Sequence, residues 1–157
     1  MPLFFQFLLL GLFGLTLFGL YRFLVSRMPE NRHYKYGIGL CIVAGFLLFW
    51  MNGAVGIIGS ENNDANMMYP GLLLLSFLAS LAVRFKPRGM VWVMRGSAVA
   101  LIAIAITALV FNVGVSGPVW PWDVIWISGF FVAMLLFAGW LFEEAAHVEG
   151  ARTEGAS

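Results

Sequence analysis

Five long apolar stretches, separated by short polar segments, run along this chain. A helix needs about 20 predominantly apolar residues to cross the hydrocarbon core of a bilayer. Strands of a membrane barrel would need polar residues at alternate positions, whereas these stretches are apolar all round. The pattern therefore predicts an all-α integral membrane bundle of five transmembrane helices. The expected spans are residues 3–21, 37–59, 67–83, 96–115 and 124–142.

The positive charges fall on alternate connections between these spans. The nine Lys and Arg residues are Arg22, Arg27, Arg32 and Lys35 before the second span, Arg84, Lys86, Arg88 and Arg95 before the fourth, and Arg152 after the fifth. The three remaining connections and ends contain none. Short loops rich in Lys and Arg stay in the cytoplasm. This distribution predicts an N-terminus outside and a cytoplasmic C-terminus.

Composition supports a membrane setting. The chain is 61% hydrophobic and 11% charged, whereas soluble domains are about 25% charged. The formal net charge of +1 gives no reason to expect nucleic acid, so membrane lipid is the expected surrounding partner. The single cysteine, Cys41, excludes an intrachain disulfide, and His33 and His147 both lie in polar segments. No cofactor, metal or catalytic set is expected.

We expect one domain, a transmembrane unit over residues 1–142, followed by a polar cytoplasmic tail over residues 143–157 that loses helical order. In the connection 84–95, Pro87 and Gly89 mark a turn, and the apolar patch 90–94 is expected to rest on the cytoplasmic interface.

Small residues on the second span indicate a helix-packing face. This face combines Gly45, Asn52, Gly56 and Gly59. Small residues let helix backbones approach closely in lipid, and an amide side chain inside the bilayer is expected to face another helix. A cavity lined by these glycines is the alternative interpretation.

A polar outer loop and an aromatic cluster form the candidate surface for a ligand or partner. Its residues are Glu61, Asn62, Asn63, Asp64, Asn66, Tyr69, Trp122 and Asp123. Oxygen-rich side chains suit a hard cation, but the same residues are typical of turns and helix caps. Asp123 is placed to cap the fifth helix. Aromatic side chains near carboxylates suit an organic cation, and tryptophans also gather at membrane interfaces.

The string from Asn52 to Tyr69 reads NGAVGIIGSENNDANMMY. A similar stretch, NGAVGIIGSE followed by N-x-A-N-x-M-Y, ends one span in a family of uncharacterised bacterial inner-membrane proteins. The family's RF-x-P-x-GM turn is matched by residues 84–90, and its late GFF…W-LF pattern by residues 129–142. Over residues 45–145 the chain therefore resembles this family. The resemblance implies a multi-pass protein of the bacterial inner (plasma) membrane and supplies no activity.

Two functions remain open. The first is a small non-catalytic accessory or partner-binding membrane subunit, with the polar outer loop as its recognition surface. The alternative is a small-solute channel or carrier that acts as a homo-oligomer, which would need a hydrated path along the Gly and Asn faces. An enzyme is disfavoured because the spans carry no converging acid, base or metal ligands.

Overall fold

The computed structural model describes residues 3–28, 30–54, 56–59, 63–115 and 119–154, and every regular element within these residues is helical. The elements in order are α1 (Leu3–Val25), α2 (Arg32–Ala54), the 3-10 helix η1 (Asp64–Met67), α3 (Met68–Ala82), α4 (Pro87–Val110) and α5 (Trp122–Glu154). The expectation of an all-α fold is confirmed.

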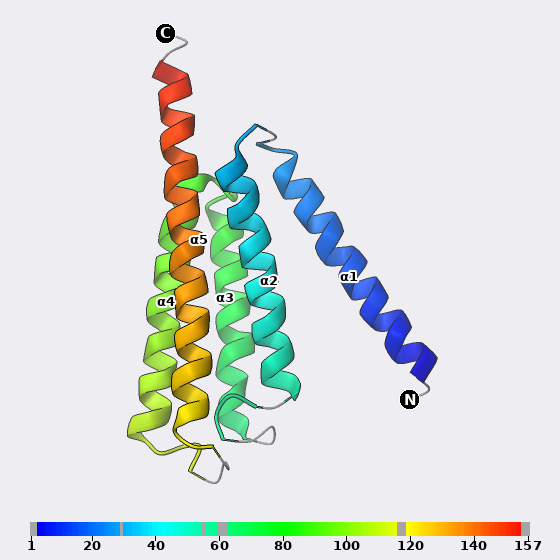
Figure 1. Cartoon of the computed structure of the whole chain (residues 1–157), viewed down its shortest axis with the longest axis vertical. Coiled ribbons are helices and arrows are strands. Elements are labelled where there is room, and N and C mark those ends of the chain that lie inside the picture. The colour runs from blue at the N-terminus through cyan, green and yellow to red at the C-terminus, as the bar shows by residue number, and fades with distance from the viewer. Residues whose placement is uncertain (1–2, 29, 55, 60–62, 116–118, 155–157) are drawn as a thin grey trace.

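Helices α2 to α5 stand side by side with alternating direction, as short connections require (Figure 1). Helix α1 leans away from this bundle, and its N-terminal part stands apart from the other helices (Figure 1). It meets the bundle near its own C-terminal end. There Leu24 is buried with the start of α2, and Tyr21 lies beside Gly39.

Four helical segments are long and apolar enough to cross a membrane: α2, η1 with α3, α4 and α5. Large apolar side chains are exposed on their outer faces, including Leu75 at 67% and Val99 at 66%. Lipid can solvate such side chains at no cost, whereas water cannot. A membrane bundle of at least these four spans accounts for the exposed apolar faces. The fifth span and the direction of the termini stay predictions.

The two ends of the bundle differ in their polar residues. We call the end formed by the described residues 26–28, 30–31 and 83–86 the basic end, because it carries Arg27, Arg84 and Lys86. We call the opposite end, formed by the described residues 56–59, 63–67, 111–115 and 119–121, the asparagine end, after Asn63 and Asn66. Each end has its own apolar core, one around Tyr34 and Phe142 and the other around Tyr69 and Leu101.

The predicted packing face of the second span is correct only in part. Helix α2 ends at Ala54, so Gly56 and Gly59 follow the helix instead of continuing its face, with φ angles of 71° and 75°. Such angles favour glycine and end a helix. Gly45 does face a neighbour, because a Cβ there would lie 3.8 Å from Leu73 of α3. Asn52 lies in the last turns of α2.

Two predicted boundaries are wrong at the basic end. Helix α4 begins at Pro87, so Met90 and Met94 lie in the basic-end core instead of resting on a membrane interface. Helix α5 continues through Glu154, well past residue 142. Its extension is held by contacts, since Ala145 is fully buried and Glu143 forms a 2.7 Å ion pair with Arg95.

Candidate functional site

The carboxamide of Asn66 organises the asparagine end. Helix η1 places this side chain beneath the loop, where only 5% of the residue is exposed. Its oxygen accepts hydrogen bonds from the backbone N–H groups of Ile57, at 3.0 Å, and Ile58, at 2.8 Å. Both isoleucines are 0% exposed. Because a buried backbone N–H must be paired, Asn66 allows the chain after α2 to fold back into the apolar core.

Asn63 joins this loop to the second loop of the same end. Its side-chain oxygen accepts from the N–H of Ala65 at 3.1 Å, which caps η1. Its amide nitrogen donates to the carbonyl of Ile58 at 3.1 Å and to that of Val113 at 2.7 Å. The sequence offers Asn63, Asp64 and Asn66 as candidates to cap the third span. Asn63 caps η1, which leads into α3, and α3 itself begins after Met67 without a side-chain cap. The Asn63 side chain also connects segments that lie 50 residues apart in the sequence.

Two glycines allow the loops to touch. A Cβ on Gly59 would lie 2.6 Å from the carbonyl oxygen of Gly114, which is closer than real Cβ contacts come. A Cβ on Gly114 would overlap the ring of Trp120. Gly59 is therefore a packing residue, as expected, but it packs loop against loop and not helix against helix.

Two members of the predicted ligand surface are buried instead of exposed. The side-chain oxygen of Asn66 is already bonded to the backbone of the loop after α2, and Tyr69 of α3 is 0% exposed. The Tyr69 hydroxyl lies 3.4 Å from the Ser128 Oγ of α5, so it links two helices inside the bundle. Buried polar groups of this kind stabilise a fold and are not open to a partner.

The accessible part of the predicted surface is smaller. Asp64 is exposed, Trp122 is 58% exposed, and Asn63 is half-buried. Asp123 lies in the first turn of α5, where its Oδ1 accepts from the N–H of Val124 at 2.8 Å. Because α5 begins at Trp122, Asp123 is inside the helix and is not its N-cap, although its carboxylate stands near the positive end of the helix dipole. Glu61 and Asn62 lie outside the described residues.

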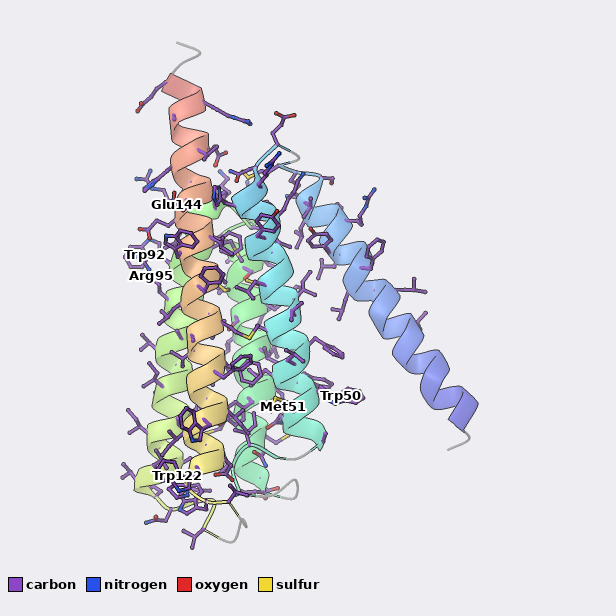
Figure 2. All side chains as sticks on the ribbon, in the orientation of Figure 1. Trp50, Met51, Trp92, Arg95, Trp122 and Glu144 are labelled. Carbon is purple, nitrogen blue, oxygen red and sulfur yellow. The ribbon has the colours of Figure 1, made fainter. Side chains whose placement is uncertain are left out.

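No group of three His, Cys, Asp or Glu side chains gathers as a metal site would require within the described ranges. Tryptophans occur at both ends of the bundle: Figure 2 shows Trp122 at the asparagine end and Trp92, beside Arg95, at the other. Trp92 and Trp126 are each 72% exposed. Exposed tryptophans at both ends of an apolar bundle are typical of membrane interfaces, which favours the interface interpretation over a cage for an organic cation.

The basic end has polar contacts that the sequence interpretation missed. The Asn31 side chain accepts from the N–H of Tyr34 at 3.1 Å, and it donates to the carbonyl of Ala145 in α5 at 2.9 Å. The Tyr34 hydroxyl donates to the carbonyl of Phe85 at 3.0 Å. An Asn directly before a helix is a common N-cap, so that part of its role was open to prediction.

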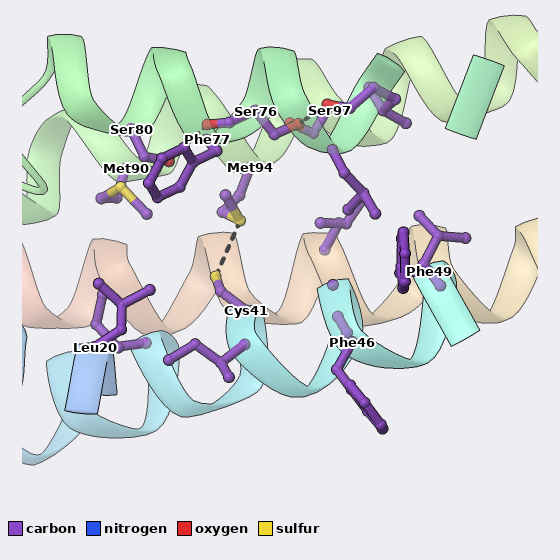
Figure 3. A pocket seen from close by; sticks show the side chains of 18 of the residues that line it. Leu20, Cys41, Phe46, Phe49, Ser76, Phe77, Ser80, Met90, Met94 and Ser97 are labelled. Atoms are coloured by element: carbon purple, nitrogen blue, oxygen red, sulfur yellow. Dashed lines mark hydrogen bonds between the residues drawn. The ribbon is translucent and has the colours of Figure 1, made fainter. Parts of the chain in front are cut away.

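An apolar cavity of about 350 Å³ lies between α2 and α3, with side chains of α1, α4 and α5 completing its wall (Figure 3). Cys41 of α2 faces Met94 of α4 across it, with the two sulfur atoms 3.2 Å apart. Its hydroxyl groups are engaged. The Ser76 and Ser97 hydroxyls lie 2.7 Å apart, so one of them donates to the other, which in turn donates to a carbonyl of its own helix. The Ser80 hydroxyl donates to the carbonyl of Ser76 at 2.8 Å.

One buried polar atom lies outside these arrangements. The Asn52 Oδ1 is buried and has no hydrogen-bond partner. Among the described residues, it is the only buried side-chain nitrogen or oxygen atom without one. Asn52 is not part of the cavity wall. The expectation that it makes a hydrogen bond to another helix is therefore not met for this atom.

Comparisons with known proteins add nothing to these observations: no protein-family model, no curated protein and no solved structure matches the chain.

Proposed function

We propose that this protein is a five-span protein of the bacterial inner membrane, with its N-terminus outside and its C-terminus in the cytoplasm. Two observations support this arrangement. Helix α1 is a 23-residue apolar helix, which is long enough to be the fifth span. The loops at the basic end hold Arg27, Arg84 and Lys86, whereas the described residues of the asparagine end hold no Lys or Arg.

Within that membrane, the proposed role is a non-catalytic accessory subunit that binds a membrane-protein partner through the asparagine end. The observation that carries this proposal is the set of hydrogen bonds from Asn63 and Asn66, which join two loops into one structure. A surface that is already ordered loses little conformational freedom when it binds. On its rim stand Asp64, Trp122 and Met67, the last of these 70% exposed.

The carrier alternative receives less support. A carrier needs a hydrated path, but the cavity within the bundle is apolar and its serine hydroxyls are already bonded. Within the described residues of one molecule, the cavity wall therefore has no row of unbonded polar groups along which water could pass.

The orientation is tested by cysteine labelling in intact cells. A membrane-impermeant maleimide should label Asp64→Cys before lysis and Arg88→Cys only after lysis. Both side chains are exposed in the structure. The native Cys41 lies within α2, in the wall of the apolar cavity, and the unsubstituted chain measures its background labelling. Labelling of both positions from the same side would refute the orientation.

The partner is tested by placing a photoreactive amino acid at Met67 and, as a matched control, at Trp92, which is equally exposed at the basic end. We expect Met67 to cross-link to one polypeptide that also co-purifies in mild detergent, and Trp92 not to do so. Asp64→Arg should release that polypeptide without changing the melting temperature, because the side chain is exposed. Cross-links to lipid or to the chain itself alone would refute an accessory role.

A further inference from the structure

We propose that the cavity between α2 and α3 holds one acyl chain of an anionic phospholipid, whose headgroup lies against the cations of the loop 83–86. The proposal rests on the membrane location of the bundle and not on the partner. Three features of the structure lead to it: the chemistry of the cavity wall, the size of the cavity, and the charges at its basic end.

The cavity wall favours hydrocarbon. Apart from the serines and Cys41, the side chains that line it are aliphatic, aromatic or Met, including Leu20 of α1, Phe46 of α2 and Phe77 of α3. Water needs two to four polar partners, and each serine hydroxyl of the wall already donates its one proton, either to a carbonyl of its own helix or to the neighbouring serine. The cavity therefore excludes water and polar solutes and accepts apolar matter.

The cavity is too large to be only a packing defect. Its volume is about 350 Å³, which falls within the usual range for ligand sites. Side chains around a space of this size lose dispersion contacts when it is empty. Lipid tails are the apolar molecules that surround a membrane bundle, and a tail that enters does not leave an apolar environment. The gain in contacts is therefore not opposed by a desolvation cost.

The basic end of the cavity supplies the selectivity. Phe85 lines the cavity there, and the centroid of its ring lies 6.5 Å from that of Phe77. Arg84 and Lys86, the residues before and after it, are exposed. Arg84 and Phe85 both have a φ of 54°, an uncommon conformation for residues with side chains. The hydrogen bond from the Tyr34 hydroxyl fixes this turn. The turn thus holds an aromatic wall inward and two cations outward, where a phosphate would lie.

The full chain is reconstituted in phosphatidylcholine vesicles that contain a minor fraction of phosphatidylglycerol with a photoreactive acyl chain, and adducts are mapped by mass spectrometry. We expect adducts on cavity residues such as Phe46 and Phe77. Gly45→Leu should lower their yield about tenfold, because Gly45 lines the cavity and its Cβ position has room. The matched control is Gly53→Leu in the same helix, which faces open space.

The headgroup is tested separately. The double variant Arg84→Gln, Lys86→Gln should lower the preference for phosphatidylglycerol over phosphatidylcholine about fivefold or more, whereas Arg88→Gln at the same end should not. Excess unlabelled phosphatidylglycerol should compete in the unmodified protein, which tests the site without any variant. The proposal is wrong if adducts form equally on the outer faces of the helices and are insensitive to Gly45→Leu. It is also wrong if two copies cross-link through this cavity and no lipid adduct forms there.

Discussion

We predict that the carboxamide of Asn66 is needed to hold the asparagine end together. In Asn66→Ala, the backbone N–H groups of Ile57 and Ile58 lose the oxygen that accepts from both of them. Each buried group left without a partner costs about 1–3 kcal/mol, so the free energy of unfolding should fall by about 2–6 kcal/mol. Few single substitutions outside a core cavity have an effect of this size.

The assay is denaturation by SDS in a mild detergent, followed by hydrogen exchange of the same variant. Exchange at the amides of Ile57 and Ile58 should be slow in the unmodified protein and fast in Asn66→Ala, because the amides then face no acceptor. Asp64→Ala is the matched control, since it changes an exposed side chain of the same 3-10 helix and should stay within about 0.5 kcal/mol. A loss below about 1 kcal/mol for Asn66→Ala, or unchanged protection of both amides, would refute the reasoning.

Three further predictions concern the loops at both ends and use the same unfolding assay. Gly59→Ala should lose about 1–3 kcal/mol, since its Cβ would meet Gly114 at a positive φ, whereas Gly53→Ala in open helix should lose nothing; equal effects would contradict this packing. Tyr34→Phe should lose about 1 kcal/mol with its bond to the Phe85 carbonyl, and Tyr36→Phe, which is 64% exposed, should not. Asn31→Ala should lose about 1–3 kcal/mol and speed exchange at the Tyr34 amide, and slow exchange there would argue against the cap.

Much of the helical part of the fold follows from the sequence. The apolar runs predict the positions of α3 and the middle of every other helix, because an apolar stretch in lipid has no alternative to internal hydrogen bonding. The start of α4 was also open to prediction. Pro87 is a favourable first residue of a helix, and Met90 and Met94 repeat at the four-residue spacing of one helix face. Interpreting Pro87 as a turn marker gave the wrong boundary.

The end of α2 could not be placed from local sequence. The run through Ile57 and Ile58 is as apolar as the helix before it, so hydropathy gives no reason to stop at Ala54. What stops the helix is the acceptor supplied by Asn66, together with the space left by Gly59. Both belong to contacts that form only after the chain has turned back. For the same reason the sequence offered Asn66 and Tyr69 as surface residues when they are buried.

The extension of α5 was missed because its stabilising contacts come from distant segments. The residues after Glu143 are small and polar, which is typical of a fraying end. The backbone carbonyl of Ala145 in this extension nevertheless accepts a hydrogen bond from the Asn31 side-chain amide, and Glu143 forms an ion pair with Arg95. Neither partner can be recognised from the composition of the tail.

Helix α5 is longer than the hydrocarbon core of a bilayer is thick. A helix of 33 residues is about 50 Å long, whereas the hydrocarbon core of a bilayer is about 30 Å thick. The remainder continues beyond the ends of the other helices at the basic end (Figure 1), where Arg152 lies 3.6 Å from Glu30 of the connection between α1 and α2. A probe or protein attached at Glu154 would therefore be carried on a stiff spacer away from the lipid headgroups, instead of swinging on a loose tether close to them.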